Sequence, residues 1–160
     1  SSNTEYITKK AKSKLWFLRR LKPLGASDTT LIDLFKLHVR STLEMAVPLW
    51  AGSITKKEIN SIERVQKIST KFILGNRYRS YDQALTILEL DNLEARRDEI
   101  CLKFAKKCLK NIKFKHWFPK ISSANTRSKA KFIKPTGKTK RYLTSSIPHL
   151  IQILNENEKS

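Results

Sequence analysis

Lysine and arginine side chains recur every three or four residues in three stretches of the sequence, a spacing that places them along one side of a helix. A row of cations of this kind suits the phosphates of a nucleic-acid backbone, whose contacts give affinity without reading the base sequence. We assign the candidate nucleic-acid-binding side chains to these stretches and to a C-terminal basic cluster: Lys12, Arg19, Arg20, Lys57, Arg64, Lys67, Lys71, Arg96, Lys103, Lys107, Lys110, Lys138, Lys140 and Arg141.

The overall charge favours the same kind of partner. The chain has 33 lysines and arginines against 14 acidic residues, a formal net charge of +19 at pH 7. No acidic residue occurs between Glu99 and Glu156. A compact chain with this charge repels itself, and binding to a polyanion relieves the repulsion. Nucleic acid is the preferred partner, although a membrane surface, or a basic surface without a specific partner, also fits the charge.

Side chains for catalysis do not converge in the sequence. Nucleotide chemistry with two metal ions needs several carboxylates around the ions. Here the acids stand at expected helix starts or beside a basic residue, as Glu44 does four residues after Arg40. His38 falls on an apolar helical face, which favours a packed histidine over a metal ligand, and the four glycines form no phosphate-binding loop. We therefore expect a chain that is not itself an enzyme and that has no catalytic residue, metal site or cofactor.

Cysteine spacing and hydropathy indicate the compartment. Cys101 and Cys108 lie on one expected helix, about 10.5 Å apart along its axis, which is farther than a disulfide allows. Both are expected to be buried thiols in a reducing compartment. No apolar run is long enough to span a bilayer, and the first residues lack the apolar segment of a signal peptide. We expect an intracellular chain without a membrane partner, and the basic cluster at 138–141 favours a nuclear location.

Apolar periodicity and capping residues predict an all-α fold. The most apolar stretch, which follows the N-cap candidates Ser27 and Asp28, predicts a central helix that is largely enclosed and ends before Pro48. Three residue pairs have the spacing of a capping box: Thr55 with Glu58, Ser80 with Gln83, and Asp91 with Glu94. The expected helices cover residues 4–22, 31–46, 55–75, 81–88 and 92–112, and a short last helix covers 146–154.

Residues 1–112 are therefore predicted to form a bundle of about four to five helices, and residues 113–160 a basic, partly extended tail. Two residues have special positions in this bundle. Arg97 projects into the apolar arc of its helix, which predicts a structural role for it. Trp16 falls among basic residues, where it could stack on a base or pack under a neighbouring loop, and packing under a loop is favoured.

Six segments, in this order, resemble the C-terminal part of reverse transcriptases from non-LTR retrotransposons of the jockey-like and related classes. Together they cover nearly the whole chain, and one departure is Met45, where the family usually has Tyr. The segments are LWFLRRLK (15–22), RSTLEMAVPLWAG (40–52), IERVQKISTKFILG (62–75), YRSYDQAL (78–85), LEARRDEICLKFAKK (93–107) and SSIPHLIQILN (145–155).

This resemblance implies a thumb and the segment beyond it, which follow the polymerase palm and hold the RNA template and the growing DNA strand. The catalytic Tyr/Phe-x-Asp-Asp motif and the earlier metal-binding Asp belong to the palm, and neither occurs in these 160 residues. Mg²⁺ is expected only in that palm. The chain is then a fragment, a truncated element copy or a domain of a longer RNA-directed DNA polymerase. Arg64, Arg96 and Arg97 match family positions, and the helical pattern supports the first two as outward contacts.

Two functions of different class stay open at this point. The preferred function is a non-catalytic thumb segment that contacts RNA and the RNA/DNA duplex through backbone phosphates, with the palm of the parent polymerase as its protein partner. The alternative is a retrotransposon-derived helical protein that binds a protein partner, in which the positive charge is incidental. Binding to an RNA/DNA hybrid that weakens steeply with salt would distinguish the first from the second.

Overall fold

A computed structural model describes residues 3–121 and 130–157. It confirms the all-α fold: helices form the regular structure, and the described residues contain a single isolated bridge, between Lys120 and Phe132. The chain divides into two compact units, which are described separately. The first unit contains residues 3–45 and 55–96, and the second contains residues 46–54, 97–121 and 130–157. This division differs from the expected one after residue 112, because residues 46–54 pack with C-terminal residues of the chain.

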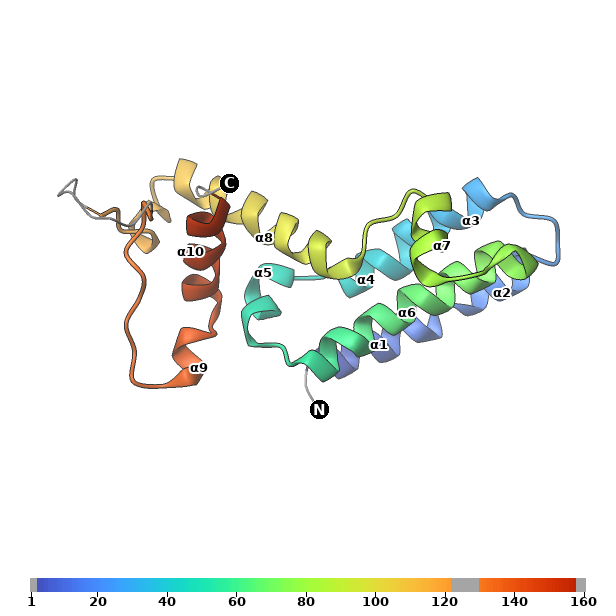
Figure 1. The fold of residues 1–160 in the computed structure, drawn as a ribbon, viewed down its shortest axis with the longest axis horizontal. Coiled ribbons are helices and arrows are strands. Elements are labelled where there is room, and N and C mark those ends of the chain that lie inside the picture. Colours follow the sequence, from blue (N-terminus) through green and yellow to red (C-terminus); the bar gives the residue numbers. More distant parts are fainter. Residues whose placement is uncertain (1–2, 122–129, 158–160) are drawn as a thin grey trace. The chain divides into compact units, whose positions relative to one another are not determined.

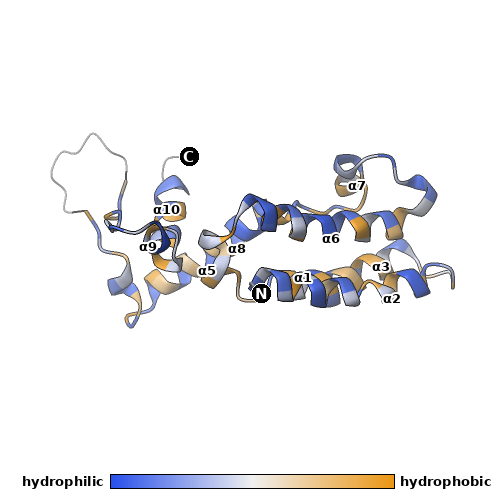
Figure 2. Cartoon of the chain, turned by 90° about the horizontal axis from the view of Figure 1, so that it is seen from below, coloured by the Kyte–Doolittle hydropathy of each residue, from blue (hydrophilic) through white to orange (hydrophobic). Residues whose placement is uncertain are grey.

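The first unit is built around α6, along which α1 and α2 lie on one side, with α3 and α7 also in contact (Figure 1). Hydrophilic and hydrophobic residues alternate around α1 and α6 at helical intervals (Figure 2). The elements of this unit are α1 (Asn3–Ser13), α2 (Trp16–Leu21), α3 (Asp28–Leu34), the π-helical turn η1 (Phe35–Arg40), α4 (Ser41–Leu43), α6 (Lys56–Leu74), the 3-10 turn η3 (Gly75–Arg77), α7 (Tyr81–Ile87) and the start of α8 (Leu93–Lys110).

The expected first helix at 4–22 is interrupted between α1 and α2. The N–H groups of Lys14 and Leu15 bond to carbonyls three residues back, at 3.1 Å each, which tightens the chain into a turn. The Lys14 ammonium reaches Thr42 Oγ1 of α4 at 2.8 Å and ties this turn to the central helix. α2 is followed by a left-handed glycine: Gly25 has a φ of 85°, and the Ala26 N–H bonds back to the Leu21 carbonyl at 3.2 Å.

The central helix is continuous from α3 to α4, with Ser27 as its N-cap and η1 in its middle. A π-helical turn contains more residues than an α-helical turn, so it suits core residues that recur every four positions, as they do in this helix. The prediction was wrong at the C-terminal end, because the helix stops at Leu43 and Met45 is 45% exposed. The core residues are Leu31, Phe35, Val39 and Leu43, each at most 1% exposed.

Helix α6 begins at the predicted capping box of Thr55 and Glu58, and both reciprocal hydrogen bonds are present. Gly75 follows it with a positive φ of 54°, but its ψ of −124° is not that of a left-handed helix cap. Its buried face includes three polar residues, and the apolar residues Ile59, Ile68 and Phe72 are only half-buried. The buried residues are Ile62, Val65, Gln66, Ser69, Thr70, Ile73 and Leu74.

The starts of α7 and α8 are fixed by different side chains. Ser80 Oγ accepts from the Gln83 N–H at 3.3 Å, which is one of the two hydrogen bonds of the predicted capping box. For α8 the expected cap Asp91 is wrong, because Asn92 Oδ1 accepts from the Ala95 N–H at 2.7 Å. The same helix ends at Lys110 rather than near Ile112, since the Asn111 side chain accepts from the Lys113 N–H at 3.0 Å.

The second unit contains α5 (Val47–Trp50), the turns η2 (Ala51–Ser53) and η4 (Lys115–Trp117), α9 (Lys140–Leu143) and α10 (Ser146–Asn157), together with α8 from Arg97 onward. Pro48 lies in the short helix α5, because proline fits the first turn of a helix. The last helix begins at Ser146 as predicted and packs on α5 and η2. Cys101 and Cys108 are buried free thiols and Arg97 is 4% exposed, all as predicted.

The tail contains more ordered contacts than expected. Phe118 and Phe132 are buried and meet edge to face, with ring centroids 6.4 Å apart. Asn155 of α10 accepts from the N–H groups of Lys131 and Phe132, at 3.1 and 3.0 Å, and donates to the Phe132 carbonyl at 3.0 Å. The part of the expected tail at 122–129 lies outside the described residues.

Candidate nucleic-acid interface

One side of α6 carries a continuous basic stripe. Its residues follow each other at alternating intervals of three and four, which aligns them along the helix. All of them are exposed, and the opposite side of the helix faces the core. We call this surface the α6 stripe; it consists of Lys57, Asn60, Arg64, Lys67 and Lys71.

The α6 stripe borders an open groove of about 510 Å³ between α6 and Tyr81 of α7. The Lys67 ammonium lies 5.7 Å from the centroid of the Tyr81 ring, and the Lys71 ammonium lies 5.2 Å from that of Tyr78. These cation–π contacts position the two ammonium groups without neutralising their charge. The groove is lined by Asn60, Glu63, Arg64, Lys67, Ile68, Lys71 and Tyr81.

Glu63 is the acidic residue among those that line this groove, and its carboxylate is already bonded. It accepts from the Tyr81 hydroxyl and from the Leu93 N–H, the latter at 3.1 Å. Burial, together with the hydrogen bond to Glu63, raises the pKa of the Tyr81 phenol, which therefore stays protonated as a donor. Glu63 thus holds the groove wall and the start of α8 in place, and it forms no ion pair with the stripe among the described residues.

One of the predicted cations of α1 and α2 lies beside the α6 stripe. The Arg19 guanidinium is 4.7 Å from the centroid of the Phe72 ring, so α2 places a cation next to the C-terminal end of the α6 stripe. Lys12 and Arg20 are also exposed. The tertiary structure thus brings two separate segments of predicted cations together within the first unit.

Arg96 does not have the predicted outward role. Its Nε and one terminal nitrogen bond the two Glu44 oxygens, at 2.5 and 3.2 Å, and its side chain is only 21% exposed. The predicted pair of Arg40 with Glu44 is present but longer, at 3.7 Å, because Glu44 is bonded more closely to Arg96. We therefore remove Arg96 from the candidate phosphate contacts.

The remaining predicted cations belong to the second unit. All are exposed, but the Lys103 ammonium is 2.5 Å from Glu99 Oε1, which partly neutralises the basic side of α8. The C-terminal cluster lies at the start of α9, where Thr139 Oγ1 accepts from the Tyr142 N–H at 3.4 Å. These residues are Lys103, Lys107 and Lys110 on α8, and Lys138, Lys140 and Arg141 at α9.

Three residues of this surface were missed in the sequence: Asn60 and Tyr81, which line the groove, and Tyr78, whose ring contacts the Lys71 ammonium. Asn60 occupies the one uncharged position of the α6 stripe, and its helical spacing could have revealed it. Tyr78 and Tyr81 come from the segment after α6, and no local pattern assigns them to a basic surface. Their position depends on the packing of α7 against α6.

The arrangement suits binding to an anionic backbone. Cations and donors project from a rigid helix, and two aromatic faces position them. Among the described residues, no three His, Cys, Asp or Glu side chains are close enough to hold a metal ion together. None of the described helices combines the length and the apolar content that a membrane span requires. Comparisons with protein-family models, with curated proteins and with solved structures found no match to this chain.

Proposed function

We propose that the chain holds nucleic acid by its sugar–phosphate backbone, and that it does so as the thumb-like segment of an RNA-directed DNA polymerase of a non-LTR retrotransposon. In this proposal the α6 stripe contacts phosphates of an RNA/DNA duplex. Polymerisation is carried out by a palm in the parent protein, which also binds the Mg²⁺. The exposed basic cluster at α9 serves nuclear entry.

The observation that carries the proposal concerns the four cations of the α6 stripe, which are Lys57, Arg64, Lys67 and Lys71. Each is exposed, and none forms an ion pair with an acid among the described residues. Like charges at this spacing destabilise a helix through mutual repulsion. A polyanion removes this cost and gains affinity by releasing its counterions. The resemblance of residues 62–75 to the reverse transcriptase segment supports the same helix independently.

The first test is binding to an RNA/DNA hybrid over a range of salt concentrations, measured by fluorescence anisotropy. If about five phosphates are neutralised, log K falls with log salt at a slope of about −4 to −5. The absence of binding at low salt by the folded chain would overturn the proposal. It would leave the helical bundle as a module for a protein partner.

A pair of matched variants tests the location of the contact. Reversing three charges of the α6 stripe (Arg64→Glu, Lys67→Glu and Lys71→Glu) and three of α8 (Lys103→Glu, Lys107→Glu and Lys110→Glu) changes the net charge equally. We expect both sets to fold and to bind the hybrid more weakly, since all six side chains are exposed. The α6 set should lose more affinity, by about tenfold, because Lys103 is already paired with Glu99.

The comparison between the two sets excludes a purely general effect of charge. Equal losses in both sets would indicate that only the net charge matters and would contradict a specific role of α6. Circular dichroism of each variant verifies that the helices are retained.

A further inference from the structure

Trp16 is the outermost ring of an aromatic column in the first unit. Its side chain is 53% exposed, so it does not pack under a loop as the sequence favoured. Its ring stacks on Phe17 with centroids 4.1 Å apart and planes 23° apart. Phe17 stacks in turn on His38 of η1, at 5.6 Å and 23°. Three nearly parallel rings therefore end in an indole that is open to solvent.

The surroundings of this indole are cationic. Arg19 and Arg20 follow Trp16 by three and four residues within α2, so they project from the same side of the helix. Lys12 precedes it by four residues across the turn between α1 and α2. All three are exposed, and none forms an ion pair with an acid among the described residues. An apolar flat surface surrounded by cations matches a nucleobase attached to a phosphate backbone.

We propose that Trp16 is a stacking site for an unpaired nucleobase, so that the chain binds a single strand there in addition to a duplex. This rests on the proposed function for its choice of polymer, and it assigns a new site and a new ligand form. A base stacks on the exposed face of the indole in the same way as Phe17 stacks on its other face. The flanking cations contact the phosphates of the same nucleotide and its neighbours.

Phe17 and His38, the other two rings of the column, make the site rigid. Phe17 is partly buried and His38 lies in the π-helical turn of the central helix, a rare geometry that is frequent at functional sites. The plane of the indole is therefore set by the fold before any base arrives, which reduces the entropy lost on binding. Stacking on an indole accepts every base, so the site is expected to be tolerant of sequence.

The test uses two variants of exposed or half-exposed tryptophans, Trp16→Leu and the matched control Trp117→Leu, with unstructured oligouridine and oligothymidine strands of about 12 nucleotides. We expect both strands to quench the tryptophan fluorescence of the wild-type chain, because a stacked base quenches the indole. In Trp16→Leu the quenching disappears and single-strand affinity falls by about 5- to 100-fold. In Trp117→Leu both are retained.

A blunt-ended RNA/DNA hybrid separates this inference from the proposed function. Hybrid affinity should change little in Trp16→Leu, because only the two terminal base pairs of the hybrid have a face open for stacking, and it should fall in the α6 set. Unchanged single-strand binding in Trp16→Leu, or an equal loss for strand and hybrid, overturns the stacking site. A wild-type chain that binds single strands with Trp16-dependent quenching but ignores the hybrid overturns the duplex function and supports the stacking site. A wild-type chain that binds neither overturns both.

Discussion

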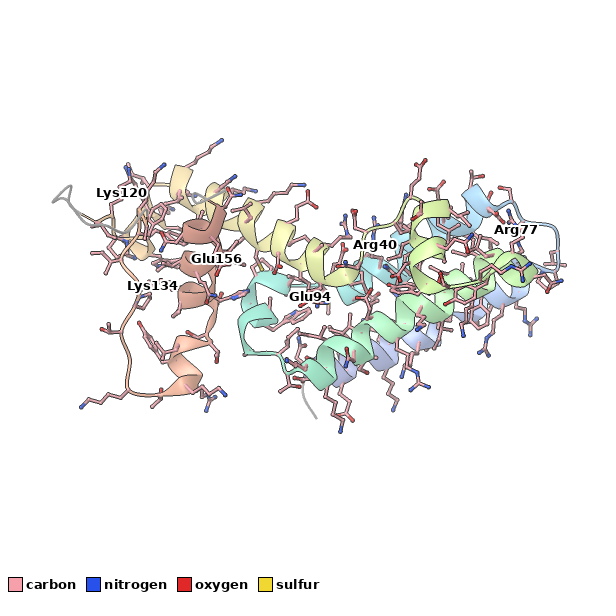
Figure 3. All side chains as sticks on the ribbon, viewed as in Figure 1. Arg40, Arg77, Glu94, Lys120, Lys134 and Glu156 are labelled. Atoms are coloured by element: carbon pink, nitrogen blue, oxygen red, sulfur yellow. The ribbon has the colours of Figure 1, made fainter. Side chains whose placement is uncertain are left out.

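Asp28 shows how one side chain joins three segments of the first unit. It is the first residue of α3, where a negative charge is favoured by the helix dipole. Its carboxylate accepts from the Lys22 ammonium at 2.9 Å and from the Arg77 guanidinium. Arg77 belongs to the turn after α6 (Figure 3). The hydrogen bond from Lys22, followed by that from Arg77, lowers the pKa of the Asp28 carboxyl.

The lowered pKa predicts a dependence of stability on pH. Below the ordinary pKa of 3.8 the unfolded chain binds this proton more readily than the folded chain. The stabilisation by Asp28 is therefore complete above that value and is lost as the pH falls through the lower pKa of the folded state. We expect Asp28→Asn to reduce the free energy of unfolding at pH 7 by about 1 kcal/mol and to flatten its decrease as the pH falls below 3.8. Urea denaturation over this pH range measures both effects.

Asp82 provides the control for Asp28. It also lies in the first turn of a helix, α7, but it forms no ion pair among the described residues. Asp82→Asn removes the dipole interaction alone, so it should cost less than Asp28→Asn at pH 7. A profile of Asp28→Asn that coincides with the wild type would contradict the proposed effect of the two ion pairs.

At the scale of elements, Glu63 connects three helices of the first unit. It projects from α6, accepts from Tyr81 of α7 and caps the start of α8 through the Leu93 N–H. Gln66, one turn further along α6, donates to the Tyr81 hydroxyl at 3.1 Å and to the Asp91 carbonyl at 2.8 Å. Two polar side chains of α6 thus position both the groove wall and the beginning of α8.

Glu63→Ala is expected to lower the free energy of unfolding by about 2 kcal/mol, because it leaves the Tyr81 hydroxyl and the Leu93 N–H without their acceptor. The control Glu94→Ala removes an exposed acid from the first turn of α8, and it should cost only about 0.5 kcal/mol. Chemical denaturation compares the two. Equal costs would show that Glu63 acts only through its charge near the helix start.

At the scale of the whole molecule, the two units have separate sets of internal contacts. The first has its core between α6 and the helices on either side of it. The second depends on α10, whose residue Asn155 is 2% exposed and holds the chain at Lys131 and Phe132 through three hydrogen bonds. A defect in one unit is therefore expected to have its main effect within that unit.

Asn155→Ala removes three hydrogen bonds to the backbone of Lys131 and Phe132, which should destabilise the second unit by about 2 kcal/mol or more. Hydrogen exchange should become faster in α10 and around residues 131–133, while α1 and α6 keep the protection of the wild type. Gln152→Ala, an exposed change on the same helix, serves as the control. Faster exchange throughout α6 in Asn155→Ala would show that the units unfold together.

Much of the fold could be predicted from the sequence where the interactions are local. The caps at Ser27, Thr55 and Ser80, and the proline at the start of α10, act within four residues along the chain, so their spacing is sufficient to identify them. The break between α1 and α2 could not be predicted in this way. It is tied to Thr42, which is 28 residues from Lys14 in the sequence.

The candidate site likewise has some features that follow from local sequence and others that depend on distant contacts. The sequence by itself determined most of the helices, and the side of α6 and α8 on which their cations lie, because both follow from helical periodicity. Only the tertiary structure decided that Arg96 is bonded to Glu44, 52 residues away, that two tyrosines accompany the α6 stripe, and that Trp16 ends an open column of rings. The availability of a charge or a ring depends on what packs beside it, and packing partners come from distant parts of the chain.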